Sequence, residues 1–401
     1  MALVFHPPAI HRSAENLQAE VIRPGDLTKE ELVAWADMRR ADPDFKSPLL
    51  SPEFALAVGR SRDDTRVAVF RKHERVVGFL PFHARPDGRA RPLGAPFSDL
   101  HALITTPDAK LEPVAALKAA GITDYRFDGL VDPFSLFQND TSGTTPSFVL
   151  KVEEEPKAVL ARLAERSPSR FKQYRRKERK IEREVGPLTL TIGDPDRQAF
   201  EALFAWKRAQ YARSGLHDVL SPVWVQHMMD DLFWQRIGSL QGCMVTLRAG
   251  GRPIAADFGP REGGAFHPWI SAYDPEMAPY SPGMLLLVRA IEAMPEFGLD
   301  TYDLGPSPET YKPYFASEVR QVSCGAVGDN ARRVRSFVNA IPNDKVRSLA
   351  ERAMRRMDQV ASVELTAWGR ARGVMRAMTA MRTRLEINSD VAVGQPEATA
   401  A

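Results

Sequence analysis

The sequence predicts an α/β (α+β) protein with two similar halves, each a mixed, mainly antiparallel sheet flanked by helices, and a helical extension after them. Two observations carry this prediction. The same order of hairpin, strand, helix and strand occurs twice along the 401 residues, and a basic, helix-forming stretch follows the second copy. A repeated order of four elements is typical of a duplicated unit.

A β-hairpin is predicted at the start of each unit. Residues 66–82, RVAVFRKHERVVGFLPF, read as two apolar strands joined by the polar turn KHER. Residues 243–259, CMVTLRAGGRPIAADFG, have the same pattern, and their turn contains a Gly-Gly pair suited to positive φ. The two hairpins therefore begin equivalent units.

Comparable elements follow each hairpin. In the first half, a helical stretch at 110–120 precedes the strand DYRFDGL, and in the second, a helical stretch at 283–297 precedes the strand TYDLG. The two final strands share their spacing: Gly121, Tyr125 and Phe127 match Gly298, Tyr302 and Leu304. We interpret the pattern as a duplication.

A dense run of mixed charge separates the halves at 162–186 and has a helix start signal at Ser167-Pro168. It is either a solvated connecting helix or a positive wall beside a cleft that receives an anionic substrate. The predicted divisions are an N-terminal half at 1–150, a basic connecting helix at 151–186, a C-terminal catalytic half at 187–330, a basic helical extension at 331–386 and a disordered tail at 387–401.

Composition excludes several classes of protein. The two cysteines, Cys243 and Cys324, are too few for a disulfide framework or a four-thiolate zinc site, which favours a reducing compartment. No signal-peptide pattern, membrane-spanning stretch, GxSxG, HExxH or P-loop occurs, and the eight histidines lack ligand spacing. We therefore expect a cytoplasmic protein with no metal.

The charge is uneven along the chain. The net charge is +3, but residues 331–384 hold thirteen arginines and lysines against four acidic residues. Arg332, Arg333 and Arg335 form one cluster, and Arg352, Arg355 and Arg356 form another. Such clusters bind cyclic di-GMP or an anionic membrane surface, or stay solvated without a ligand. A peripheral location at the inner membrane is the expectation for the first two outcomes.

Three strings in the second half carry a family resemblance: AFHPWISAYDP (265–275), SPGMLLL (281–287) and YDLGPSPETYKPYF (302–315). They resemble the GNAT-type domain of CelD- and BioF-like acetyltransferases, which include exopolysaccharide and holdfast-polysaccharide acetyltransferases of alphaproteobacteria. That family is related in fold to the FemABX transferases, which also pair two GNAT halves. The resemblance implies N- or O-acetylation of a sugar unit in an exopolysaccharide or its precursor, with an N-acetyltransferase as the main expectation and acetyl-CoA as co-substrate.

A donor site is expected where the second apolar helix begins. A helix N-terminus offers unpaired N–H groups and partial positive charge to the pyrophosphate of acetyl-CoA. The turn at Tyr280 leads into the expected donor-binding residues Ser281, Pro282, Gly283, Met284 and Leu285. This loop departs from the family pattern, because no arginine or lysine follows before Arg289. An ordinary helix start is the alternative interpretation.

The candidate catalytic residues are His267, Tyr273, Asp257, Tyr311 and Lys312. Strand alternation predicts that His267 and Tyr273 share one face, where one could accept a proton and the other donate one. The Tyr311-Lys312 pair is similar to an aromatic-lysine pair of FemABX relatives, which implies a role in stabilising an oxyanion. The alternatives are a satisfied buried histidine and a surface lysine.

Two other functions remain open at this point. One is a FemABX-like aminoacyl transfer from charged tRNA, although the weak interleaving of aromatic and basic residues makes a nucleic-acid partner unlikely. The other is a non-catalytic regulator on a degenerate GNAT fold. The segment PLGAPFSDLHALI (92–104) lacks a helix start, so we expect the first half to form the acceptor wall.

Overall fold

The computed structural model describes residues 17–85, 87–306, 311–328 and 340–366, with the separate positions 333, 336, 338, 368–371, 373 and 375. The predicted disordered tail at 387–401 and the arginines Arg332 and Arg335 lie outside the described residues. The same holds for the side chains of Arg352, Arg355 and Arg356.

The first half alternates strands with three helices. Its strands are β1 (Leu17–Ile22), β2 (Thr65–Lys72), β3 (Arg75–Ala84), β4 (Arg89–Pro92), β5 (Ile104–Thr105), β6 (Asp124–Leu130) and β7 (Thr141–Lys151), and its helices are α1 (Lys29–Ala41), α2 (Pro52–Ser61) and α3 (Pro113–Ala119). Helix α1 starts at a capping box, in which the side chains of Thr28 and Glu31 each accept the backbone N–H of the other residue.

The connecting region and second half follow the same plan. The helices are α4 (Pro156–Arg166), α5 (Pro168–Glu184), α6 (Arg197–Ser214), α7 (Val223–Trp234), α8 (Pro282–Ala293) and α9 (Lys312–Phe315). The strands are β8 (Leu188–Ile192), β9 (Arg236–Ile237), β10 (Leu240–Ala249), β11 (Arg252–Glu262), β12 (Ala265–Phe266), β13 (Ile270–Tyr273), β14 (Thr301–Pro306) and β15 (Glu318–Val327). The predicted helix start at Ser167-Pro168 is confirmed, because Pro168 is the first residue of α5.

Both predicted hairpins are present. Strands β2 and β3 pair antiparallel around His73 and Glu74, and β10 and β11 pair around Gly250 and Gly251. All four turn residues have positive φ, the conformation that two-residue hairpin turns require. The second turn uses glycines, which reach it without steric cost.

The repeat extends through the whole of both halves. Asp124 and Thr301, which begin β6 and β14, are 177 residues apart, and Thr141 and Glu318, which begin β7 and β15, show the same offset. Gly121 and Gly298 both adopt the left-handed conformation before these strands. The predicted fold class, with two similar units on a mixed sheet flanked by helices, is confirmed.

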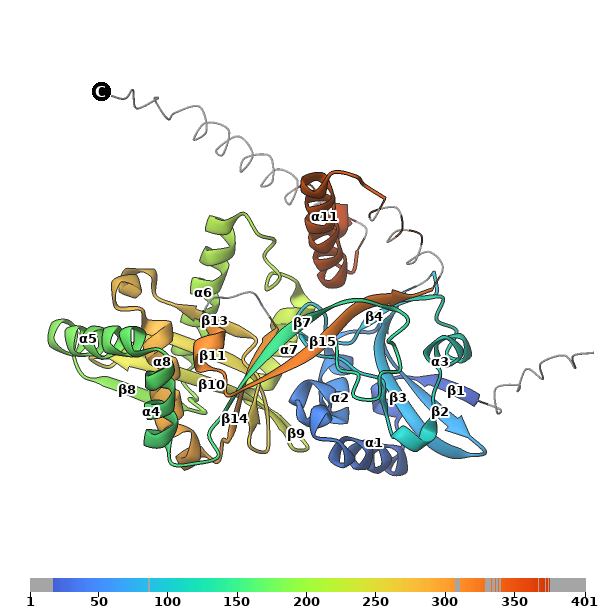
Figure 1. The fold of residues 1–401 in the computed structure, drawn as a ribbon, viewed down its shortest axis with the longest axis horizontal. Helices are drawn as coiled ribbons and strands as arrows, with labels where there is room; N and C mark the ends of the chain where they lie inside the picture. Colours follow the sequence, from blue (N-terminus) through green and yellow to red (C-terminus); the bar gives the residue numbers. More distant parts are fainter. Residues whose placement is uncertain are drawn as a thin grey trace, which may run out of the picture.

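The two halves exchange strands. Their fifteen strands form one sheet, with the main order β1-β2-β3-β4-β6-β15-β7-β14-β12-β11-β10-β8. Strand β15 of the second half pairs with β6 of the first, while β7 of the first half pairs with β14 of the second. The long strands β7 and β15 run side by side from one lobe to the other (Figure 1). The halves therefore share hydrogen bonds that neither can make alone.

Helices cover both faces of the sheet. Side chains of α1, α2, α6 and α7 pack in one core that joins the two halves, and it includes Trp35, Phe54 and Trp224. On the opposite face, α4, α5 and α8 pack over the second half. Residues from α3 form a separate core over the first half. At β11 and β14, the two faces of the sheet therefore pack against different sets of helices.

The predicted helix-rich extension contains α11 (Asp344–Val363), which rises from the body between the two lobes (Figure 1). Its C-terminal residues Val360 and Val363 are buried, whereas Val346 and Met357 are about half exposed. Among the described residues, every helix is too short or too polar to traverse a lipid bilayer.

Candidate active site

Strands β12 and β14 run parallel but pair over only two residues. Ala265 is paired with Thr301 and Phe266 with Tyr302, after which β13 stays with β11 and leaves β14. In the first half the equivalent strands β4 and β6 also pair over two residues. There the chain itself continues the pairing with β6, through a parallel bridge between His101 and Leu130. In the described part of the second half, by contrast, no backbone pairing continues between the chain after β12 and strand β14.

Helix α8 begins beside this separation. Ser281 adopts a left-handed conformation with φ 55°, and Pro282 has no N–H, so Gly283 carries the first N–H of the helix. A Cβ at Gly283 would meet only Tyr273, at 3.9 Å, which leaves space for a ligand group. The N–H groups of Met284 and Leu285 donate to the carbonyl of Ser281, and the Leu285 side chain is buried in the core. Of the five expected donor-binding residues, Ser281, Gly283 and Met284 are partly exposed, whereas Pro282 and Leu285 are buried.

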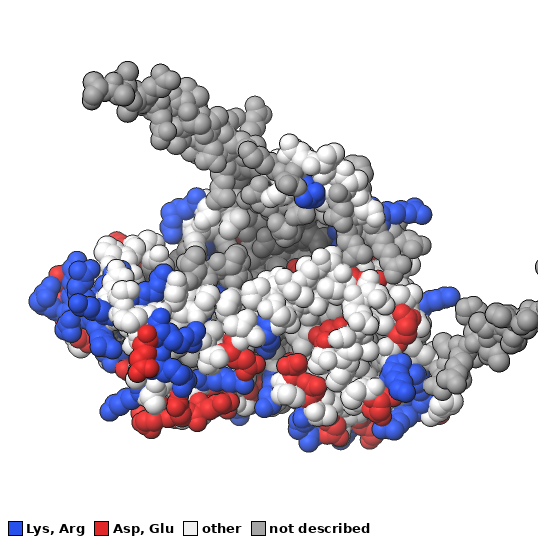
Figure 2. Space-filling view, in the orientation of Figure 1, with Lys and Arg blue, Asp and Glu red and all other residues white. Residues whose placement is uncertain are grey.

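The basic residue that the donor loop lacks comes from another helix. Lys177 of α5 donates from Nζ to Oγ of Ser281, and Lys180 lies over the ring of Tyr280, with 5.2 Å from Nζ to the centroid. Lys172, Arg175 and Arg176 of the same helix are exposed to solvent. Basic side chains gather at the end of the molecule where α5 lies (Figure 2). This arrangement favours the earlier interpretation of the 162–186 run as a positive wall.

The prediction that His267 and Tyr273 share one face is wrong. Phe266 pairs with Arg261 of β11, but Ile270 pairs with Phe258, so one extra residue is inserted on the 265–273 side. Such a bulge inverts the alternation of side chains. The inserted region includes Pro268, and the carbonyl of His267 approaches Gly259 so closely that a Cβ there would lie 2.0 Å from it.

The sheet register therefore places the two residues on opposite faces. His267 donates its N–H to the carbonyl of Pro260, while Tyr273 pairs with Ala255, five residues away on β11. Ala255 belongs to the core under α8. Tyr273 is 44% exposed on that side, and His267 is fully buried on the side of α6 and α7.

His267 is held between two carboxylates. Its Nε2 lies 3.3 Å from Oδ2 of Asp99, and its Nδ1 lies 3.4 Å from Oδ2 of Asp303. Arg320 of β15 donates to Asp303 as well. Asp303 is buried, whereas the Asp99 side chain is 40% exposed. Asp99 is thus the member of the cluster that solvent reaches most easily.

The charges of this cluster are strongly coupled. Burial would lower the pKa of His267, but the neighbouring charges of Asp303 and Asp99 outweigh it and raise the pKa to about 9. Burial would likewise raise the pKa of Asp303, but His267 and Arg320 hold it far below its usual range. His267 is therefore an imidazolium at neutral pH, which suits a hydrogen-bond donor better than a general base.

The other predicted catalytic residues lie on the α8 face. The hydroxyl of Tyr302 donates to Asp257, which occupies the face shared with Ala255. Tyr311 packs against the α8 core. Burial, together with the neighbouring Asp257, raises the pKa of Tyr302 well above its usual range. Lys312 is 7% exposed and donates from Nζ to the carbonyl of Leu304. The alternative of a surface lysine is excluded.

Three residues at the site were missed by the sequence reasoning. Asp99, Arg320 and Lys177 come from a loop, a strand and a helix that are remote in sequence from His267 and Ser281. No group of three or more histidine, cysteine or acidic side chains within the described ranges is arranged to bind a metal ion.

Residues 168–313 match the family model described as the acetyltransferase (GNAT) domain. The match begins at the first residue of α5 and ends in α9, so it spans both Lys177 and Lys312. The chain contains a GNAT-type acetyltransferase domain. The GNAT domain implies an acyl-CoA donor. No curated protein matches the sequence significantly.

Several solved structures are similar to this chain at low sequence identity. FemX is 10% identical, with a TM-score of 0.49 over 77% of this chain and 96% of its own. A tandem GNAT protein from the clavulanic acid biosynthesis pathway is 13% identical, with a TM-score of 0.42 over 78% and 98%. The GCN5-related glucosamine N-acetyltransferase region of a fungal β-N-acetylglucosaminidase is 11% identical, with a TM-score of 0.44 over 79% of this chain and 38% of that one.

Proposed function

We propose that this protein transfers an acetyl group from acetyl-CoA to the amino group of a sugar in an exopolysaccharide or its precursor. The observation that carries the proposal is the division of polar groups between the two faces of the sheet. The N-terminus of α8 and Lys177 lie on one face, and the cluster of His267, Asp99 and Asp303 lies on the other. Between the two faces, β12 and β14 stop pairing after Phe266 and Tyr302.

The donor binds on the α8 face in this proposal. Its pyrophosphate contacts the N–H of Gly283 and the ammonium of Lys177, since both carry positive charge and neither is deeply buried. The exposed basic residues of α5 extend the positive electrostatic potential beyond the pyrophosphate. The acyl group then reaches the sheet at Phe266 and Tyr302, beyond which β12 and β14 part.

The acceptor approaches from the His267 face, along the loop 93–103 of the first half. Its amine attacks the thioester carbon, the new C–N bond forms as the C–S bond breaks, and Asp99 takes the amine proton. His267, fixed by Asp303, holds the Asp99 carboxylate and balances its charge. On the α8 face, the Tyr311 hydroxyl gives its proton to the leaving thiolate, and Lys312 stabilises the oxyanion.

The test is a transfer assay with acetyl-CoA and a panel of amino sugars, free and linked to a nucleotide or lipid carrier. Release of free thiol together with a mass increase of one acetyl group on one acceptor class supports the proposal. Transfer of an aminoacyl group from charged tRNA would instead establish the FemABX-like alternative. Failure to bind acetyl-CoA at millimolar concentration would favour a non-catalytic regulator.

The place of action is part of the same proposal. We infer a peripheral protein on the cytoplasmic side of the inner membrane, where the basic C-terminal region meets anionic lipid or cyclic di-GMP. Support comes from the excess of basic residues at 331–384 and from the free thiols of Cys243 and Cys324. Sedimentation with anionic vesicles at low and high salt tests the lipid, and a titration with cyclic di-GMP tests the dinucleotide.

A further inference from the structure

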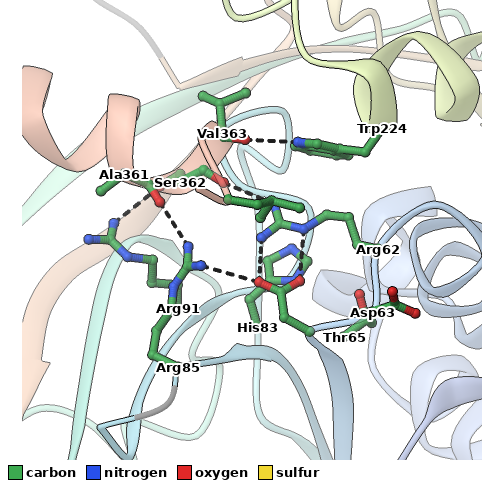
Figure 3. Close-up of polar contacts among 12 residues, drawn as sticks. Arg62, Asp63, Thr65, His83, Arg85, Arg91, Trp224, Ala361, Ser362 and Val363 are labelled. Carbon is green, nitrogen blue, oxygen red and sulfur yellow. Dashed lines mark hydrogen bonds and ion pairs between the residues drawn. The ribbon is translucent and has the colours of Figure 1, made fainter. Parts of the chain in front are cut away.

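The C-terminal end of α11 is bound by arginines of the first half. Arg62 Nη1 donates to the carbonyl of Ser362 at 2.9 Å, and Arg85 Nη2 donates to that of Ala361 at 2.8 Å. Arg91 Nη1 lies 3.1 Å from Oγ of Ser362 (Figure 3). The last carbonyls of a helix lack intrahelical partners and carry partial negative charge, so these guanidinium groups cap the helix.

The second half contributes to the same socket. The indole Nε1 of Trp224, in α7, donates to the carbonyl of Val363 at 2.8 Å, and the guanidinium of Arg62 stacks 4.4 Å from the centre of the indole ring. Val363 and Val360 are 0% and 1% exposed. The end of α11 is therefore buried between residues of both halves, while its opposite end at Val346 is half exposed.

A chain of hydrogen bonds leads from this socket to the active-site loop. Arg62 Nη2 donates to Oδ2 of Asp64 at 2.7 Å, and the other carboxylate oxygen of Asp64 lies 3.1 Å from Nδ1 of His83. Nε2 of His83 accepts the N–H of Gly94 at 2.9 Å. Burial and the nearby Arg62 lower the pKa of His83 to about 4, so its ring is neutral and can accept at Nε2 while it donates at Nδ1.

Gly94 anchors the turn that presents Asp99. The N–H groups of Phe97 and Ser98 both donate to the carbonyl of Gly94, which makes residues 94–98 a tight turn. The Phe97 ring lies 6.3 Å from that of Trp224 and 6.1 Å from that of Trp269. One end of the turn is thus fixed by His83 and the socket, and the other carries Asp99 to His267.

We propose that docking of the α11 end into this socket positions Asp99 against His267, so that the C-terminal segment controls the transfer reaction. This inference rests on the proposed function. Arg62, Asp64 and His83 act as positioning residues, because they touch neither donor nor acceptor. When α11 is released, Arg62 and Arg85 lose the helix carbonyls to which they donate, and the hydrogen bonds that anchor the 94–98 turn are loosened.

The test compares two full-length variants with the same substitution in α11. Val363→Asp places a carboxylate in the buried end and should release it, whereas Val346→Asp alters the exposed end and is the matched control. Release is measured as faster amide exchange in residues 344–363 and in 94–99. We expect kcat to fall by about threefold to thirtyfold with the KM for acetyl-CoA nearly unchanged, and the control to match wild type.

A second pair addresses the socket from the other side. Arg62→Ala should reproduce the faster amide exchange of residues 94–99 and the loss of kcat. Arg60 is exposed at the same end of α2, so Arg60→Ala is the control and should change neither. Release of α11 with unchanged exchange at 94–99, or with unchanged kcat, would overturn the proposal. If the wild-type protein transfers no acyl group, the proposed function fails, while the exchange at 94–99 still decides whether the socket positions the loop.

Discussion

Oδ2 of Asp99 lies 3.3 Å from Nε2 of His267, so a carboxylate of the first half completes a histidine site of the second. The contact requires both halves in one sheet, because the 93–103 segment is held by β6 while His267 follows β12. Duplication of the unit thus does more than repeat a fold. In the proposed function, one copy binds the donor and the other contributes to the acceptor side.

Replacement of Asp99 tests this contact directly. Asp99→Asn removes the proton acceptor and one negative charge beside His267, and its 40% exposure allows the variant to fold. We expect kcat/KM to fall at least about tenfold, about 1.4 kcal/mol of transition-state stabilisation. Asp63→Asn, at a 98% exposed side chain of the same half, is the control. Wild-type turnover in Asp99→Asn would remove this residue from the mechanism.

The pKa of His267 predicts a pH dependence of stability. The folded-state pKa, about 9, lies above the ordinary value of 6.5, so the proton binds more tightly in the folded protein. This contribution to the free energy of unfolding is fully present below pH 6.5 and is lost as the pH rises through about 9. Denaturant unfolding across this range should show a decline that is absent in His267→Gln. Parallel curves for the two proteins would contradict the assignment.

Lys177 should contribute to donor affinity. Lys177→Ala removes the ammonium beside Ser281 at the start of α8, and we expect the Kd for acetyl-CoA to rise about tenfold at low salt and less at high salt. Lys172→Ala changes the same residue type on the same helix, at an exposed position five residues before Lys177. Isothermal titration of both variants with acetyl-CoA distinguishes a specific contact of Lys177 from the general positive potential of α5. Equal losses of affinity in the two variants would favour the general potential.

Gly283 offers a second test of the donor site. Gly283→Glu places a carboxylate beside the first N–H of α8, where it competes with the pyrophosphate. The open space around Gly283 lets either substitution fold, so Gly283→Ala serves as the steric control. We expect the glutamate variant to lose measurable acetyl-CoA binding and the alanine variant to keep it. Unchanged affinity in the glutamate variant would show that the donor docks elsewhere.

Tyr311→Phe removes the hydroxyl proposed to protonate the leaving thiolate. Because the ring is retained, its packing against the α8 core should be kept and thermal stability should change little. We expect kcat to fall about tenfold with the donor KM unaffected. Lys312 is less suited to this comparison, since its buried ammonium supports the carbonyl of Leu304 and its loss also affects folding. A wild-type kcat for Tyr311→Phe would assign the proton to another donor.

The sequence by itself determined the repeated architecture and the position of the donor helix. Hairpin turns, helix starts and strand spacing are local properties, so KHER, Gly250-Gly251 and Ser281-Pro282 could be recognised from neighbouring residues. Tyr125 and Tyr302 occupy equivalent buried positions for the same reason. The matched GNAT domain at 168–313 agrees with the half in which the donor helix was predicted.

Only the tertiary structure decided which residues form the site. The bulge at 267–269 depends on the register with β11, and it alone separated His267 from Tyr273. Asp99, Lys177 and Arg320 reach the site through packing of distant segments and through the exchange of β7 and β15. Such contacts are set by the burial of whole faces of the sheet, and no local pattern in the chain encodes them.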